Sequence, residues 1–449
     1  MNSVSSVLEK VRLKKANVAV LGLGHVGLPT ALIFARAGFK VTGVDSDVRK
    51  VEALRQGTCY IREPGLQGLL TACLKSGTFE IVSNPSDAIR RSDFVSTCVP
   101  TPVKNAKPDL TYFETAINSV MACAHERMTV LIESTLPPST TLKFVLPELQ
   151  HTGYRVDEEI FLAYCPERLA PGHALEEYVN NARIVGGIGP RSSEIAAEFF
   201  KTVCKNIVVT DALTAEIAKV AENTFRDLNI AYANLLALIA ERLGGDVIKV
   251  IDAANTHPRV TIHRPGLGVG GPCLPKDPYL LVHGLPEDLG QLVTCGRKLN
   301  DHMPGRIIDL LTRALLAKGI SLENAKISVL GVAYKADTED VTNSPVKTIV
   351  EELLKKKAFV TTFDPYSSET FGGERAVSIE QALRDADCVI VAAAHTDFKS
   401  MDLSLLRQLA KPHCVIFDGS RLLDATRVRG LGLTYLGTGY GCGNYGKSF

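Results

Sequence analysis

The two ends of this chain repeat the same series of hydrophobic segments. NVAVLGLG (residues 17–24) and KISVLGVA (residues 326–333) are each an apolar run that stops at a glycine. FKVTGVD (residues 39–45) and AFVTTFD (residues 358–364) each follow a helical segment and end in aspartate. Short apolar runs that alternate with helical segments predict βαβ units. The repeat therefore predicts an α/β protein with a mostly parallel sheet at each end.

The parallel continues into the next segments. NPSDAIRRSDFVSTCVP (residues 84–100) and SIEQALRDADCVIVAAA (residues 378–394) both predict a helix that leads into a strand. TVLIEST (residues 129–135) and CVIFDGS (residues 414–420) each add a strand with polar residues at its carboxyl end. Two Rossmann-like, doubly wound parallel-sheet domains are expected.

Strand signals vanish between residues 205 and 325. There we expect Thr214 to cap a helix of roughly 30 residues, about 45 Å long at 1.5 Å per residue, which ends before Gly244. Such a helix is longer than the width of one small domain, and helices of this length often pack against another subunit. The predicted domains are residues 1–204, a dinucleotide-binding domain, residues 205–325, a helical dimerisation region, and residues 326–449, a second Rossmann-like domain.

Composition excludes several classes of protein. The 449 residues carry 50 Lys plus Arg against 49 Asp plus Glu, so we expect no nucleic-acid or anionic-membrane surface. The 11 cysteines include no CxxC pair, so we expect no metal site and reduced thiols in the cytoplasm. Residues 16–35 carry no formal charge, but glycines and a proline interrupt them, so they predict a buried strand rather than a membrane span.

GLGHVG (residues 22–27) follows the first apolar run and opens a helix. Its glycines allow a tight turn and close approach of the backbone, so that a pyrophosphate can lie at the helix N-terminus. Asp45 comes 23 positions after Gly22, near the usual spacing for a carboxylate that binds the adenine ribose. Because a 2′-phosphate would meet that negative charge, the pattern favours NAD over NADP. The alternative is a glycine turn that binds nothing.

PGLGVGGPCLPKDP (residues 265–278) shows neither helical nor strand periodicity and holds Cys273 in its middle. Most cysteines are small core residues, but here Lys276 follows closely, and an ammonium stabilises a thiolate. A thiolate can trap an aldehyde as a thiohemiacetal, whose oxidation gives a thioester that water hydrolyses. A nicotinamide with a catalytic thiol therefore suggests oxidation of an alcohol to an acid.

Three further polar groups allow two interpretations each. Lys219 and Asn223 lie four apart on one helix face and could stabilise an oxyanion; alternatively Lys219 extends to solvent and Asn223 bonds locally. Glu167 and Arg168 are either functional or a turn-forming polar pair. Lys335 offers a positive charge where a strand of the second repeat ends, or is a solvated surface lysine.

Several ordered motifs resemble the UDP-glucose and GDP-mannose dehydrogenase family over nearly the whole chain. They are GLGHVGLP, CVPTP, EST, CPERLAPG, EIAKVAENTFRDLNIA, GVGGPCLPKDP, GVAYKADTEDVTNSP and DGSR. The resemblance implies a four-electron oxidation of a sugar C6 hydroxyl to a carboxylate with two NAD⁺. It also implies a homodimer or higher homo-oligomer and a role in polysaccharide biosynthesis.

The resemblance also implies roles for individual residues. Cys273 is the implied thiol, Lys219, Asn223 and Asp277 are the implied polar group around the oxygen and water, and Glu167 and Thr135 are implied to handle that water. Arg259 is implied to reach the sugar of a neighbouring subunit. The implied substrate-binding residues are Glu167, Arg168, Lys219, Asn223, Arg226, Arg259, Gly270, Lys335 and Arg421. The implied cofactor-binding residues are Gly22, Gly24, His25, Val26, Gly27, Asp45, Thr101 and Thr135.

Within the family, CPERLAPG, NTFRDLNIA and NTHPRV resemble the branch that acts on UDP-N-acetylhexosamines. This favours UDP-N-acetyl-D-mannosamine as substrate, then the gluco epimer or UDP-glucose. Two positions depart from the pattern: Lys276 stands where bacterial members of that branch often lack a lysine, and Thr342 replaces the usual arginine near the cofactor phosphates. The alternatives are a two-electron dehydrogenase of a hydroxy acid and a nucleotide-sugar-binding protein without catalysis.

Overall fold

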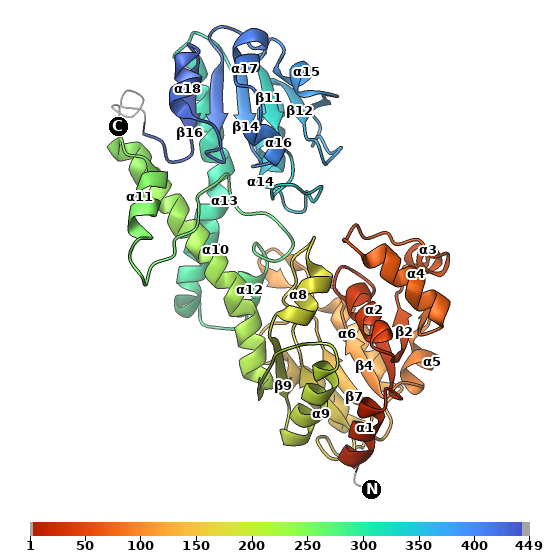
Figure 1. The fold of residues 1–449 in the computed structure, drawn as a ribbon. Helices are drawn as coiled ribbons and strands as arrows, with labels where there is room; N and C mark the ends of the chain where they lie inside the picture. The colour runs from red at the N-terminus through yellow and green to blue at the C-terminus, as the bar shows by residue number, and fades with distance from the viewer. Residues whose placement is uncertain (1–2, 442–449) are drawn as a thin grey trace. The chain divides into compact units, whose positions relative to one another are not determined.

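The computed structural model describes residues 3–441 and separates into two compact units (Figure 1). The first unit consists of Met1–Glu222 with Tyr279–His283, and the second of Asn223–Pro278 with Gly284–Phe449. The border falls inside one long helix, α10 (Ala212–Leu243). Each unit contains one of the two predicted sheets.

The sheet of the first unit has eight strands in the order β10-β9-β8-β7-β4-β1-β2-β3. All neighbours run parallel except β8 and β9. Its strands are β1 (Asn17–Leu21), β2 (Lys40–Val44), β3 (Phe79–Val82), β4 (Phe94–Thr97), β7 (Thr129–Ile132), β8 (Phe161–Tyr164), β9 (Arg183–Gly187) and β10 (Ile207–Asp211). A two-stranded hairpin, β5 (Val103–Lys104) and β6 (Lys107–Pro108), lies outside this sheet.

Helices cover both faces of this sheet, which explains its continuous apolar strands. Successive side chains of β1 point to opposite faces, so Val18 and Val20 join one hydrophobic cluster while Ala19 and Leu21 join another. The helices are α1 (Ser3–Arg12), α2 (Gly27–Arg36), α3 (Val48–Arg55), α4 (Leu66–Ser76), α5 (Pro85–Arg90), α6 (Thr111–Met121), the π-helix η1 (Thr141–Val145), α7 (Leu146–His151), α8 (Ala174–Asn180) and α9 (Pro190–Lys201).

The sheet of the second unit has six parallel strands in the order β13-β12-β11-β14-β15-β16. Its strands are β11 (Lys326–Leu330), β12 (Phe359–Phe363), β13 (Glu374–Arg375), β14 (Cys388–Val391), β15 (Val415–Asp418) and β16 (Thr434–Gly437). The remaining helices are α11 (Val247–Ala254), α12 (Asp277–Leu281), α13 (Glu287–Leu316), α14 (Pro345–Lys355), α15 (Ile379–Leu383), α16 (Thr396–Lys399), α17 (Ser404–Leu409) and α18 (Ala425–Gly430). The predicted α/β class with two doubly wound sheets is confirmed.

The repeat seen in the sequence extends to hydrogen bonds. β1 lies between β2 and β4, and β11 lies in the same way between β12 and β14. Asp45 follows β2 and accepts from the backbone N–H of Leu23 at 2.9 Å. Asp364 follows β12 and accepts from the backbone N–H of Val332 at 2.7 Å. In both sheets, therefore, a carboxylate closes the turn after the first strand.

Two local predictions are wrong. Strand signals do not vanish at residue 205, because Ile207–Asp211 forms the edge strand β10, a short β-branched run whose Val208 and Val209 are half-exposed. Thr214 does not cap α10. The helix begins at Ala212, and the Asp211 carboxylate accepts from the N–H and hydroxyl of Thr214 at 2.9 and 2.6 Å. The preceding aspartate therefore supplies the capping oxygens.

The predicted long helix is present, since α10 continues without a break over 32 residues to Leu243. Between residues 3 and 441, none of the helices combines the length and the apolar character that crossing a bilayer requires. The ten cysteines of this part of the chain form no disulfide.

Candidate functional site

The glycine turn after β1 has the shape that a dinucleotide requires. Gly22 has a φ of +90°, and a Cβ there would lie 2.6 Å from the carbonyl oxygen of Cys98. A Cβ on Gly27 would lie 1.8 Å from the Gly22 oxygen, whereas one on Gly24 would meet nothing within 4 Å. Packing therefore requires the first and third glycines, and the middle glycine leaves open space over the start of α2. That space suits a pyrophosphate at a helix N-terminus.

Asp45 lies beside this turn. Its Oδ2 accepts from Leu23 and its Oδ1 accepts from the N–H of Asp47, both at 2.9 Å. A carboxylate offers about four acceptor positions, so two stay available for ribose hydroxyls. His25 is exposed and Val26 is half-buried immediately before α2, where the first N–H groups have no intrahelical partner. These residues fit NAD.

Two other predicted cofactor residues lie together. The Thr101 hydroxyl donates to the carbonyl oxygen of Thr135 at 2.6 Å. Next to them, the Ser134 hydroxyl accepts from the N–H of Val99 at 2.9 Å. These contacts join the segments that follow β4 and β7, two adjacent strands, at their carboxyl ends. The sheet therefore fixes this edge, where ligands of open α/β sheets bind.

Glu167 and Lys219 form a buried ion pair in the first unit. Lys219 Nζ lies 3.1 Å from Glu167 Oε1 and also donates to the Glu167 carbonyl oxygen. Glu167 Oε2 accepts from the N–H of Leu169 at 2.7 Å. Only 6% of the Lys219 side chain and 10% of the Glu167 side chain are exposed. The interpretation that Lys219 extends to solvent is therefore wrong.

Arg168, the next residue of the CPERLAPG segment, faces a different partner. Its guanidinium pairs with the Glu222 carboxylate on α10 and donates to the Ala182 carbonyl oxygen at 3.1 Å. Asn181 donates back to the Arg168 carbonyl oxygen at 2.8 Å. These contacts fix the turn that carries Glu167.

In the second unit, Cys273 is half-buried at a tight turn that leads into α12. Its carbonyl oxygen accepts from the N–H groups of Lys276 and Asp277 at 3.0 and 2.8 Å. Asn223 Nδ2 donates to Asp277 Oδ2 at 2.6 Å, and Lys276 Nζ lies 2.9 Å from Asp277 Oδ1. The ammonium expected to act on the thiol is thus paired with the buried Asp277 carboxylate.

The loop that carries Cys273, residues 265–276, packs on the segment after β11. A Cβ on Gly270 would lie 2.5 Å from Tyr334 Cβ, so the Tyr334 side chain requires a glycine there. The Gly271 N–H donates to the Thr342 carbonyl oxygen at 2.8 Å, and Asn343 Nδ2 donates to the Gly271 carbonyl oxygen at 3.1 Å. Burial, followed by the charges of Asp340 and Cys273, raises the pKa of Tyr334 to about 12.

Tyr334 and Asn343 were not among the predicted site residues. They lie in GVAYKADTEDVTNSP, whose position after a strand-ending glycine, matching the dinucleotide turn of the first repeat, was the available signal. Their contact with a loop some 70 residues earlier depends on tertiary packing, which local patterns do not encode.

The remaining predicted cations differ in exposure. Arg226, Arg259 and Lys335 are exposed, and the charge of Arg226 acts on the Tyr334 hydroxyl, where it opposes the rise in pKa. Arg421, in contrast, pairs with Asp246 at 3.0 Å and donates to the Thr438 carbonyl oxygen at 3.1 Å.

Three stretches of the chain match the domains of one family. Residues 16–204 match the NAD binding domain of the UDP-glucose/GDP-mannose dehydrogenase family, residues 213–301 its central domain and residues 328–425 its UDP binding domain.

Relatives align over almost their whole length. The UDP-N-acetyl-D-mannosamine dehydrogenase of Pyrococcus horikoshii is 39% identical over 425 residues, which are 94% of this chain and 99% of that protein. A solved structure of UDP-D-ManNAc dehydrogenase from this organism gives a TM-score of 0.88 at 39% identity and covers 95% of this chain and 99% of that one. The NDP-N-acetyl-D-galactosaminuronic acid dehydrogenase of Methanosarcina mazei, 32% identical, gives 0.85 and covers 98% of each chain. The chain belongs to the UDP-glucose/GDP-mannose dehydrogenase family.

Proposed function

We propose that this protein is an NAD-dependent dehydrogenase that oxidises the C6 hydroxyl of UDP-N-acetyl-D-mannosamine to a carboxylate. The observation that carries the proposal is the full-length similarity, at 39% identity, to a relative named for that substrate. The glycine turn and Asp45 support the choice of cofactor, because their geometry fits a dinucleotide. UDP-N-acetyl-D-glucosamine and UDP-glucose are the next candidate substrates.

Cys273 is the proposed nucleophile. Its thiolate adds to the C6 aldehyde formed in the first oxidation and gives a thiohemiacetal. Loss of a second hydride leaves a thioester, and water cleaves the C–S bond to release the carboxylate and the thiol. Two molecules of bound NAD⁺, used in succession, supply the hydride acceptors, so four electrons leave the sugar.

The two polar pairs have separate proposed roles. The Glu167 carboxylate, paired with Lys219, holds and deprotonates the water that attacks the thioester, and Thr135 positions the same water. Asn223, oriented by Asp277, donates a hydrogen bond to the oxygen that becomes negative when the thiolate or water adds. Groups that are already oriented stabilise such charge without reorganising.

Two further groups of residues have proposed binding roles. Gly24 would lie against the phosphates of NAD and Asp45 would bind its ribose. The full set of proposed NAD-binding residues is Gly22, Gly24, His25, Val26, Gly27, Asp45, Thr101 and Thr135. The exposed cations Lys335, Arg226 and Arg259 would contact the anionic nucleotide sugar, while Arg168, Gly270 and Arg421 would shape its surroundings. We propose that residues 1–204 bind NAD, residues 205–325 form the dimerisation region and residues 326–449 bind the UDP-sugar. The predicted location of the protein is the cytoplasm.

We also propose a homodimer. Phe225, Tyr232, Leu235, Ile239 and Leu243 recur on one face of α10, and each is between 43% and 79% exposed. A row of exposed apolar side chains along a helix of this length marks an interaction surface. A second copy of the chain is the proposed occupant, and Arg259 would then reach the neighbouring sugar.

Counting NADH tests the reaction. Purified protein with excess NAD⁺ and limiting UDP-N-acetyl-D-mannosamine should release two NADH per sugar. One NADH per sugar would favour a two-electron dehydrogenase, and sugar binding without NADH would favour a non-catalytic binding protein. The same assay with UDP-hexoses and the other UDP-N-acetylhexosamines would rank the substrates.

A further inference from the structure

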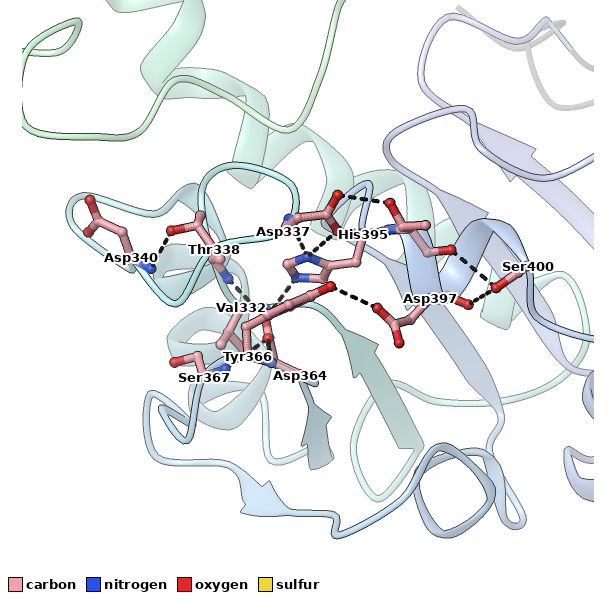
Figure 2. Close-up of polar contacts among 12 residues, drawn as sticks. Val332, Asp337, Thr338, Asp340, Asp364, Tyr366, Ser367, His395, Asp397 and Ser400 are labelled. Carbon is pink, nitrogen blue, oxygen red and sulfur yellow. Dashed lines mark hydrogen bonds and ion pairs between the residues drawn. The ribbon is translucent and has the colours of Figure 1, made fainter. Parts of the chain in front are cut away.

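His395 is fully buried in the second unit and lies between two loops that follow strands of its sheet (Figure 2). The Asp337 N–H donates to its Nδ1 at 2.8 Å, and its Nε2 lies 3.1 Å from Asp364 Oδ2. Because Nδ1 accepts a hydrogen bond, Nε2 carries the proton and donates it to the carboxylate. Burial would raise the pKa of Asp364, but hydrogen bonds from His395 and backbone N–H groups lower it to about 2, so the acceptor is ionised.

Asp337 returns the contact. Its carboxylate accepts from the N–H and the hydroxyl of Thr396, both at 2.8 Å. Residues 395–396 and Asp337 therefore hold one another through three hydrogen bonds, which we call the latch (Figure 2). Beside the latch, the Tyr366 ring packs on His395 with centroids 5.0 Å apart, and its hydroxyl donates to Asp397 at 3.0 Å.

The latch fastens one side of the loop formed by residues 333–343. The other side of this loop contacts the cysteine loop, since Gly271 bonds to Thr342 and Asn343, and the Tyr334 ring lies against Gly271. Cys273 follows Gly271 by two residues, and Lys335 belongs to the 333–343 loop itself. One segment thus connects the latch to both proposed functional groups.

Comparison of the two sheets shows which residue of the first unit corresponds to His395. Thr97 ends β4 opposite Leu21, and Val391 ends β14 opposite Leu330. Four residues beyond these points lie Thr101 in the first unit and His395 in the second. In the second unit, therefore, the His395 imidazole donates a hydrogen bond to Asp364, the carboxylate that corresponds to Asp45. The chain itself closes the crevice where a second dinucleotide would place its ribose.

We propose that His395 is a positioning residue, whose neutral imidazole holds the 333–343 loop through Asp337 and thereby places Cys273 and Lys335. The inference rests on the proposed function of those two residues. It assigns His395 no contact with substrate or cofactor.

A pair of substitutions separates the two sides of the imidazole. In His395→Asn, the amide oxygen can take the place of Nδ1 and still accept from Asp337, but the bond to Asp364 is lost. In His395→Gln, the longer amide can still donate to Asp364, but the acceptor for Asp337 is lost. We expect His395→Gln to raise KM for the UDP-sugar and the rate of Cys273 alkylation by iodoacetamide about five- to tenfold, which corresponds to one lost hydrogen bond. His395→Asn should stay within about twofold of the unsubstituted protein in both.

Asp337→Gly tests a second, exposed site. Asp337 has a φ of +55°, which glycine adopts without strain, and the variant should also raise KM and alkylation because two of the three latch bonds are lost. Ser400→Ala is the matched control, since it removes hydrogen bonds to the carbonyl oxygens of Thr396 and Asp397 and leaves the three latch bonds in place. Equal values for the Asn and Gln variants, with only the melting temperature lowered, would overturn the proposal. Alkylation and calorimetric UDP binding need no turnover, so they test the latch even if the unsubstituted protein released no NADH, a result that would instead refute the proposed reaction.

Discussion

Cys273 gives the reaction its most direct test at the level of one residue. In Cys273→Ser, the hydroxyl is far less ionised and less nucleophilic than a thiol, so the aldehyde cannot be carried on through a thioester. We expect uronate formation to fall by at least about 10³-fold while NAD binding and the melting temperature stay unchanged. Uronate is measured by mass spectrometry and folding by thermal denaturation.

Cys295→Ser is the matched control for this variant. Cys295 is an exposed thiol on α13, outside the loop of residues 265–276, so its loss should not affect turnover. Full uronate output from Cys273→Ser would contradict the covalent route. Equal losses of uronate formation in both variants would show that removing any accessible thiol has this effect, and that Cys273 has no special role.

Lys219 shows where a local pattern left two interpretations open. The four-residue spacing from Asn223 allowed either a solvent-exposed ammonium or a functional one, and the structure buries this side chain against Glu167. Glu167 lies 52 residues earlier in the chain, and burying an ammonium requires such a paired charge.

At the level of elements, the glycine turn between β1 and α2 allows packing to be separated from ligand binding. A Cβ added at Gly24 enters open space, so Gly24→Ala should fold with an unchanged melting temperature. The variant should bind NAD more weakly, because the added methyl group occupies the place of the pyrophosphate. A Cβ added at Gly27 meets the Gly22 oxygen at 1.8 Å. Gly27→Ala should therefore lose about 3 kcal/mol of stability or more. Calorimetric titration with NAD and chemical denaturation measure the two effects.

The two glycine variants serve as controls for each other. If Gly24→Ala bound NAD as tightly as the unsubstituted protein, the open space above α2 would not be the cofactor site. If both variants were equally destabilised, packing alone would account for the motif.

Elements were predictable where one physical signal dominated. The apolar runs that became β1, β2, β11 and β12 end at a glycine or aspartate, and buried parallel strands require such runs. β10 was missed although it contains Ile207, Val208 and Val209, because it is a partly exposed edge strand whose pairing with β9 depends on tertiary packing. The polar groups of the site were identified individually, but the pairs Glu167–Lys219 and Asn223–Asp277 span more than 50 residues. Such pairs follow from sheet topology, which local periodicity does not determine.

On the scale of the whole molecule, two sheets that share the arrangement of strands around β1 and β11 differ in what lies at their strand ends. In the first, the crevice beside Asp45 stays open over the glycine turn. In the second, Gly331 is followed by Val332 and Ala333, and His395 closes on Asp364. The same fold therefore provides a dinucleotide site in one unit and a support for the cysteine loop in the other, and the difference depends on a few side chains at the strand ends.

The apolar face of α10 predicts how complete molecules associate. Leu243 is 79% exposed at the end of a row that includes Phe225 and Ile239, so Leu243→Asp should place an unpaired carboxylate in the proposed dimer interface. We expect light scattering to show a dimer for the unsubstituted protein and a shift towards monomer for the variant. The melting temperature of the dimer should also rise with protein concentration, because association stabilises the folded state by mass action.

Val377→Asp is the matched control: Val377 is 85% exposed but lies away from α10, between β13 and α15, so its substitution should leave the mass unchanged. A dimer that survives Leu243→Asp with unaltered affinity would place the interface on another surface and leave this row of side chains without a partner.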